Sequence, residues 1–228
     1  MHYLRRKQQS FMENLKSIMA QHGYSLSFTT SSLRTLESVK LARLYAKYQN
    51  WSVVRDHVIE YNTLQQRTTT SSKKLCRELL SRLKLLSDDE LEYLTDCPES
   101  EAALIVWVAA CRRYAFIRDF VLEVLAERRL QLSIVIEPSD FNVFFSSKLA
   151  YHKELESISV ATRHKVQQVI FTMLREAGFL GRQNTLNIVT PAVETLRILD
   201  SPGREVITVL GIHEMIVGNA SNRRWTDI

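Results

Sequence analysis

The sequence predicts a mainly α-helical protein, and three observations support this. Hydrophobic residue types make up 45% of the 228 residues, which is enough to build one large core or two small ones. Six glycines and four prolines leave few turns, which favours long helices over a many-stranded sheet. Apolar residues also recur at helical spacing along most of the chain. We expect an N-terminal helical bundle domain and a smaller C-terminal helix-turn-helix or winged-helix-like domain with a short β-hairpin.

The first part of the chain is expected to be a helical extension over residues 1–24, followed by the bundle domain over residues 25–131. The extension begins with the basic residues 5–7 and continues with apolar residues at helical spacing. In the bundle, Ser31 or Ser32 is the predicted N-cap of the first helix, and Ser52 of the second.

A hydroxyl-rich loop, residues 67–72, leads into the third helix of the bundle, which carries an apolar stripe of Leu75, Leu79, Leu83 and Leu86. Ser87 and Glu90 form a capping box for a short acidic helix that stops at Pro98. Two more helices are predicted, from Ser100 to about Arg112 and from about Tyr114 to Arg129.

The second domain is expected over residues 132–228, where a short β-like run precedes a helix start at Pro138. A turn over residues 152–157 follows this helix, and a long helix then runs from about Ser159 to Ala177 and is ended by Gly178. Residues 187–189 are predicted to form one strand of the hairpin, and residues 193–199 another helix. Helix, turn, helix and hairpin is the order of a helix-turn-helix or winged-helix module.

The formal charge of +5 and a pI of about 9.1 permit a polyanionic partner. Residues 1–130 hold 20 Lys and Arg against 15 Asp and Glu, whereas residues 131–228 hold ten of each. The three cysteines show no pairing pattern and no signal peptide precedes them, so a cytoplasmic location is expected. The apolar run 102–111 is too short to span a membrane and predicts a buried core helix.

Motifs for catalysis are absent from the sequence. It has no GxxxxGK[ST], GxGxxG or GxSxG motif, and Val217 stands where the second histidine of an HExxH motif starting at His213 belongs. None of the ten lysines has Asp or Glu two positions upstream, a spacing that a restriction-type nuclease would usually show. The interpretation is a non-enzyme without a metal or other cofactor, although distant carboxylates can still meet in a fold.

Two helix faces are candidates for binding DNA. On the third helix, Lys73, Arg77 and Lys84 lie within roughly 40° of one another, and Arg67 and Lys74 flank the same end. The alternative interpretation is a solvated helix face with an N-cap serine. Cations at a helix N-terminus oppose the macrodipole, which weakens this alternative and favours an anionic ligand. This face is therefore the predicted principal phosphate grip.

The second face lies on the long helix, where Lys165, Gln168, Thr172 and Arg175 are opposite the apolar residues. The same pattern is also typical of any solvent-facing helix. Further DNA-binding candidates are Arg112, Arg113 and Arg163. Arg112, Arg113 and Arg118 border the apolar run, so pairing with Asp119, Glu123 or other acids is an equally weighted structural alternative. Residues 87–101 carry seven acids and no base, which could meet a protein partner.

Several distinctive stretches of the sequence resemble the BrxA family of the bacteriophage-exclusion (BREX) defence loci. The similarity covers roughly residues 25–190 and includes Phe28-Thr29-Thr30, Glu37-Ser38, Gln66-Arg67-Thr68, Lys73-Lys74-Leu75, Cys111 to Tyr114, Phe116 to Phe120, Asp140-Phe141, Lys148, His152, Thr162-Arg163, Lys165 and Leu174 to Gly178. The resemblance implies a cytoplasmic accessory component of a phage-defence system that binds double-stranded DNA and has no known enzymatic activity.

The predicted function is non-catalytic binding of double-stranded DNA, mainly through phosphate contacts, within an assembly of BREX proteins. The alternative is a helical adaptor that docks other BREX proteins through segment 87–101 and has only incidental DNA affinity. A cryptic nuclease is a third, weaker possibility.

Overall fold

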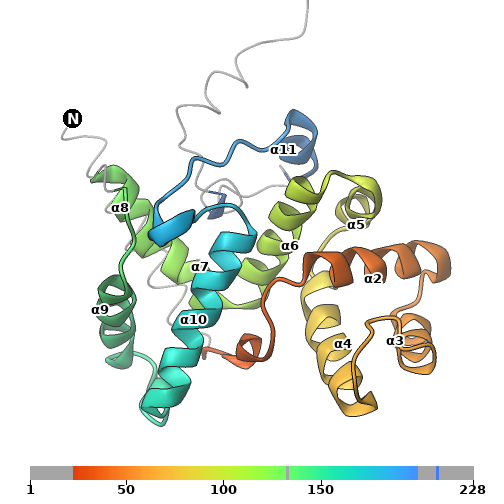
Figure 1. Cartoon of the computed structure of the whole chain (residues 1–228), viewed down its shortest axis with the longest axis horizontal. Helices are drawn as coiled ribbons and strands as arrows, with labels where there is room; N and C mark the ends of the chain where they lie inside the picture. The colour runs from red at the N-terminus through yellow and green to blue at the C-terminus, as the bar shows by residue number, and fades with distance from the viewer. Residues whose placement is uncertain (1–22, 132–133, 200–208, 211–228) are drawn as a thin grey trace, which may run out of the picture.

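The structure, a computed structural model, describes residues 23–131, 134–199 and 209–210 (Figure 1). Most of the predicted helical extension and of the C-terminal tail, including residues 5–7 and His213, lies outside these residues. The described chain is mainly helical, as predicted. In its first half a 3-10 turn, η1 (Ser27–Thr30), is followed by α2 (Thr35–Tyr48), α3 (Trp51–Glu60), α4 (Thr69–Leu83), α5 (Asp88–Asp96) and α6 (Glu99–Arg113).

Side-chain caps fix where three of these helices begin. Thr68 accepts a hydrogen bond from the Ser71 amide at the start of α4, and Ser87 and Glu90 form the predicted capping box of α5. The cap of α3 is Asn50 instead of the predicted Ser52, because the Asn50 carboxamide oxygen accepts from the next two free amides. The starts of α3 and α5 were therefore predicted to within two residues. The start of α4 was not, because this helix begins at Thr69, inside the predicted loop 67–72.

The predicted cap of the first bundle helix is wrong. The N-cap of α2 is Arg34, which has a left-handed backbone conformation (φ 56°) and provides no side-chain cap. Ser31 cannot cap the helix, because its side chain is buried and accepts a hydrogen bond from Arg82. The backbone carbonyls of Ser31 and Ser32 also accept from Arg82, which holds this segment in an extended path before the helix begins.

Helix α6 is the centre of the core. All residues from 102 to 111 are buried, as predicted for a core helix, and Trp107 is fully enclosed with its indole nitrogen donating to the carbonyl of Val209 at 2.9 Å. Helices α2, α4, α5 and α7 (Ala115–Phe120) pack around α6. No helix in the described part of the chain is long and apolar enough to cross a membrane.

The second half of the chain continues the helical path. Helix α7 runs through a π-helical turn, η2 (Val121–Leu125), into α8 (Ala126–Leu130). Next come α9 (Pro138–Leu149), the 3-10 turn η3 (Lys153–Leu155), α10 (Val160–Glu176), η4 (Arg182–Asn184) and α11 (Val193–Leu199). The predicted signals are confirmed at Pro138, which is the first residue of α9, at Ser159, which caps α10, and at Gly178, whose φ is 82°.

The short hairpin is not formed among the described residues. Two isolated antiparallel bridges occur there, Val135 with Thr185 and Leu180 with Leu186. The amide of Asn187 donates to the carbonyl of Phe179 and its side chain to that of Gly178, so this segment meets the residues that follow α10, and the antiparallel pairing there stops at one bridge.

The hydrophobic core runs from α2 to α10 without a break. Phe116 and Phe120 of α7, for example, contact Phe141 and Phe144 of α9. The division into domains near residue 131 stays a prediction, as does the winged-helix character of the second one.

Candidate nucleic-acid interface

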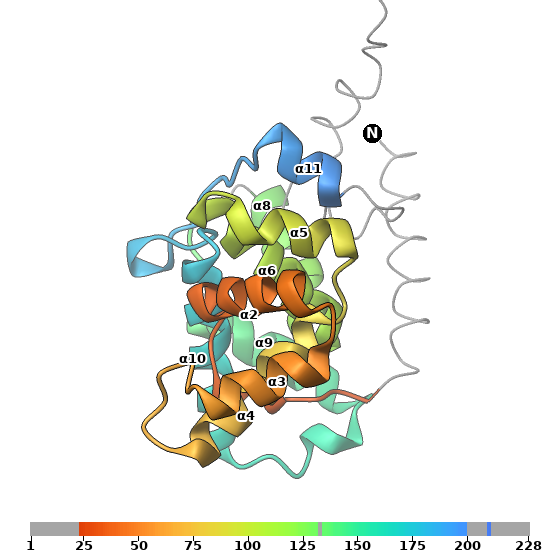
Figure 2. The ribbon, with the colours of Figure 1, turned by 90° about the vertical axis from the view of Figure 1, so that its right-hand side faces the viewer.

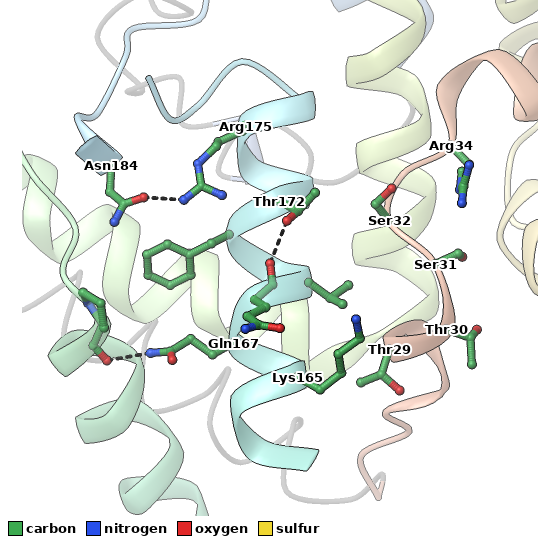
Figure 3. Close-up of a pocket in the computed structure, with 14 residues that line it drawn as sticks. Thr29, Thr30, Ser31, Ser32, Arg34, Lys165, Gln167, Thr172, Arg175 and Asn184 are labelled. Carbon is green, nitrogen blue, oxygen red and sulfur yellow. Dashed lines mark hydrogen bonds between the residues drawn. The ribbon is translucent and has the colours of Figure 1, made fainter. Parts of the chain in front are cut away.

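A groove of about 570 Å³ separates α10 from the chain segment that leads into α2 (Figure 3). Helix α10 lines it with Lys165, Gln168, Thr172 and Arg175, while residues 29–32 and Arg34 line the opposite side. The lining residues therefore include three cations, several hydroxyls and amides, and no acid. A groove of this composition can donate hydrogen bonds to an anion and attract its charge, and no lining residue repels an anion.

The amphipathic pattern of α10 places its polar residues at the groove. Val166, Val169, Ile170 and Met173 are buried, as the sequence predicted. Lys165, Gln168, Thr172 and Arg175 are exposed, and the Arg175 guanidinium is steadied by the side-chain oxygen of Asn184 at 2.6 Å. The long helix is therefore oriented as expected, with its candidate DNA-binding residues on one wall of a concave surface.

The other wall is residues 27–34, here called the wall segment, and it is fixed mainly by contacts that the sequence did not reveal. Phe28 and Leu33 are fully buried and anchor it in the core. From α4, Arg82 donates to the carbonyl of Ser32 at 2.8 Å and to that of Ser31 at 3.3 Å. From α10, Glu176 accepts a hydrogen bond from the Leu33 amide at 2.7 Å.

Arg82 is held by a buried acid on its own helix. Its side chain is 1% exposed and pairs with Glu78, 8% exposed, with the Nη2 and Oε1 atoms 2.8 Å apart. Glu78 also accepts from the Tyr114 hydroxyl. Burial raises the pKa of Tyr114, and the hydrogen bond to Glu78 raises it further, so the phenol stays protonated and keeps donating.

A sequence signal for this pair existed and was missed. Glu78 and Arg82 are four residues apart and share the helix face of Leu75, Leu79 and Leu86. Charged residues on an apolar face indicate a buried pair, so Arg82 does not belong to the exposed basic surface of residues 61–84.

The remaining cations of α4 form a second exposed surface. Arg67, Lys73, Lys74, Arg77 and Lys84 are all exposed, while Glu78, the single acid among residues 61–84, is buried. Of the five hydroxyl residues at the helix start, Thr68 serves as the cap and Ser72 is buried, so three remain exposed beside the cations. The exposed surface of α4 is thus free of acids along its length.

Helix α10 and the start of α4 lie on one side of the molecule. In Figure 2, α10 and the loop that leads from α3 into α4 are both at the left edge of the ribbon. The wall segment contacts both helices, since η1 packs against α10 and against α4. An extended polyanion could therefore contact both surfaces at once.

The other predicted DNA-binding residues have intramolecular partners. Arg112 forms a two-pronged ion pair with Glu90, with distances of 2.6 and 2.7 Å, and donates to the carbonyl of Leu85. The Arg113 guanidinium lies over the Tyr114 ring, 5.2 Å from its centroid. Arg163 donates to the backbone and side-chain oxygens of Asn142 and lies over Phe145. Each of the three therefore has a structural contact, and the partner of Arg112 is Glu90, not Asp119 or Glu123.

We expect Arg112→Ala to lower the free energy of unfolding by about 2–3 kcal/mol, because Glu90 is 1% exposed and would keep a buried charge with a lost partner. Chemical denaturation measures this loss. DNA affinity of the folded variant should stay within about twofold of the unaltered protein; normal stability with weakened binding would instead identify Arg112 as a DNA contact.

The acidic segment 87–101 divides into buried and exposed acids. Glu90 pairs with Arg112, and Glu101 accepts hydrogen bonds from the Thr195 hydroxyl and the Ala192 amide, which fastens α11 to α6. The acids that remain exposed are Asp88, Asp89, Glu92, Asp96 and Glu99. They lie on α5 and at the start of α6 and give this face the opposite sign to α4 and α10.

Burial raises the pKa of the Cys76 and Cys97 thiols to about 11 and raises that of Cys111 further, so all three stay protonated at neutral pH. Among the described residues, no group of three His, Cys, Asp or Glu side chains could hold a metal ion.

The fold and the groove define the class of protein to which the chain belongs. It is a mainly helical protein with a cationic groove, lined by no acid, between α10 and the wall segment. Comparison with protein families identifies it further. The BrxA family model matches residues 22–201, and the chain belongs to the BrxA family, as the resemblance predicted.

Individual relatives agree with this assignment. The BREX protein BrxA of Bacillus cereus (strain H3081.97) is 28% identical over 162 residues, which cover 70% of this chain and 80% of that protein. The BREX protein BrxA of Escherichia coli O9:H4 (strain HS) is 24% identical over 181 residues, covering 78% and 85%. A crystal structure of an uncharacterized protein from Magnetospirillum magneticum has the same fold, with a TM-score of 0.73 at 18% identity over 84% of this chain and 100% of that one.

Proposed function

We propose that this protein is a non-catalytic component of a BREX phage-defence system that binds double-stranded DNA mainly through its phosphates. The observation that carries the proposal is the groove beside α10, whose lining holds three cations and no acid. Membership of the BrxA family and the names of the two relatives support the BREX setting. We infer other BREX proteins as further partners and the cytoplasm as the location.

Point charges and hydroxyls dominate both cationic surfaces, and this supports phosphate contact over base readout. Gln168 is the one predicted interface residue with the paired donor and acceptor that reads a base edge. Phosphate contacts carry no sequence information, so unrelated duplexes should bind with similar affinity. The protonated state of all three thiols supports the proposed absence of cysteine-based catalysis.

The salt dependence of binding tests this mechanism. If about four to six phosphates are neutralised, log K against log[salt] should have a slope of roughly −4 to −5 for each of several unrelated duplexes. Fluorescence anisotropy titrations of the full chain at several salt concentrations give this slope. A flat response, or strong preference for one duplex sequence, would contradict phosphate-dominated binding.

A helical adaptor is the second candidate function, and the exposed acids of α5 favour it. Asp88, Asp89 and Glu92 are exposed on one helix, on a face unsuited to DNA. The two functions are compatible, because the acidic face and the groove use different residues. Reversal of these three acids to lysine should weaken association with other BREX proteins in pull-downs while DNA affinity is kept or increased.

A further inference from the structure

The wall segment is held from its inner side by a guanidinium that DNA cannot reach. Arg82 donates to the carbonyl of Ser32 at 2.8 Å, to that of Ser31 at 3.3 Å and to the Ser31 hydroxyl at 3.2 Å. With 1% of its side chain exposed, Arg82 has no surface to offer a phosphate. Its contacts with the wall segment cross about 50 positions of sequence.

Burying the Arg82 guanidinium costs desolvation free energy. A contribution to the stability of the fold is a poor explanation for an arginine at this position. A buried ion pair such as Arg82 with Glu78 is often no more stabilising than apolar residues of the same volume. What an apolar residue cannot supply is the fixed fork of donors that reaches two carbonyls and a carboxylate together. The fork turns the carbonyls of Ser31 and Ser32 inward, on the segment whose other side lines the groove.

The wall segment is also held from the opposite direction. Glu176, on α10, accepts a hydrogen bond from the amide of Leu33, which lies directly after the two carbonyls bound by Arg82. The segment is thus clamped between α4 and α10, and these are the two helices that carry the exposed cations.

We infer that Arg82 is a positioning residue of the DNA interface: it fixes the wall segment and thereby the spacing between the groove cations and those of α4. This inference rests on the proposed function. A polyanion with regularly spaced phosphates binds more tightly to cations that are held at a fixed separation. The reason is that cations ordered before binding lose less conformational entropy when the polyanion binds. If the wall segment is less rigidly held, Arg34 and the neighbouring hydroxyls should contact the DNA phosphates less well, although no exposed charge has been removed.

Two variants and one matched control test the inference. Arg82→Lys keeps the charge beside Glu78 but lacks the fork, and the double variant Glu78→Gln/Arg82→Met removes the pair without leaving a buried charge. The control is Glu90→Gln/Arg112→Met, which removes an ion pair between α5 and α6 whose acid is also buried but whose arginine is partly exposed. None of these variants alters the cations that line the groove or the exposed face of α4.

The measurements are thermal melting, amide hydrogen exchange, and DNA titration of the full chain well below each melting temperature. Melting should fall in both double variants. In the Arg82 variants, the amides of Ser31 and Leu33, which donate to the Phe28 carbonyl and to Glu176, should exchange faster than in the control. Their DNA affinity should fall about tenfold at 0.1 M salt, and the salt slope should shrink by about one, as for one lost phosphate contact. The control should keep the affinity and slope of the unaltered protein.

Wild-type affinity and slope in both Arg82 variants would overturn the inference, as would an equal loss in the control, which would show a merely structural role. Failure of the unaltered protein to bind duplex DNA is a different result: it would contradict the proposed function itself, and the inference with it.

Discussion

Lys165→Glu combined with Arg175→Glu should lower the affinity for duplex DNA on the order of 100-fold at 0.1 M salt. Both side chains line the groove, and no acid lines it to compensate for them. At a slope of about −0.9 per phosphate, one contact strengthens binding about eightfold between 1 M and 0.1 M salt, so two contacts account for about 60-fold. The introduced carboxylates add repulsion to this loss. Titration at fixed salt measures it.

Stability should fall only slightly in this variant. Both residues are exposed, but Arg175 lies in the last turn of α10, where a glutamate opposes the macrodipole by about 0.3–1 kcal/mol. The matched control is Lys47→Glu/Arg197→Glu, which makes the same change in net charge with exposed residues at the end of α2 and on α11. A comparable loss of affinity in this control would show that net charge, not the groove, governs binding.

Lys73→Glu combined with Arg77→Glu should weaken DNA binding to a similar extent, on the order of 100-fold by the same reasoning. Both cations are exposed on α4, and the acid next to them, Glu78, is turned into the core. Melting should be nearly unchanged, because both side chains are exposed and two glutamates four residues apart repel each other by only about 0.2–0.5 kcal/mol.

The two pairs of variants together locate the DNA. Similar losses from both are expected if one duplex crosses α10 and the start of α4, which lie on the same side of the molecule (Figure 2). If the α4 variant binds normally and the α10 variant fails, the groove alone holds the DNA and the ranking of α4 as principal grip is wrong.

Local sequence signals predicted most of the helices because the interactions that start and stop a helix are themselves local. The capping box of Ser87 and Glu90, the first-turn proline of α9 and the left-handed Gly178 each involve residues within one turn of the boundary. The α2 boundary failed for the opposite reason. The Ser31 hydroxyl and the Ser32 carbonyl accept from Arg82, about 50 positions away, and hold the segment extended, which no local pattern could show.

The sequence predicted which side chains of the candidate site are exposed, but it did not predict the groove that they line. The spacing of apolar residues on α4 and α10 correctly placed Lys73, Arg77, Lys165 and Arg175 at the surface. The groove combines α10 with a segment more than 130 positions earlier, and the sequence held no sign of that contact. The predicted strand at residues 187–189 is not formed, since the antiparallel pairing with the residues after α10 stops at the bridge of Leu180 with Leu186.

The sequence by itself determined the helical character, the family and the cationic excess, since composition, periodicity and motif strings are properties of the chain alone. Only the tertiary structure decided which cations are free. Arg112 looks like Lys73 and Arg77 in a list of basic residues, yet it is partly covered and paired with the buried Glu90. The physical reason is desolvation: a charge can be buried only where packing brings it a partner, and for Arg112 that partner comes from another helix.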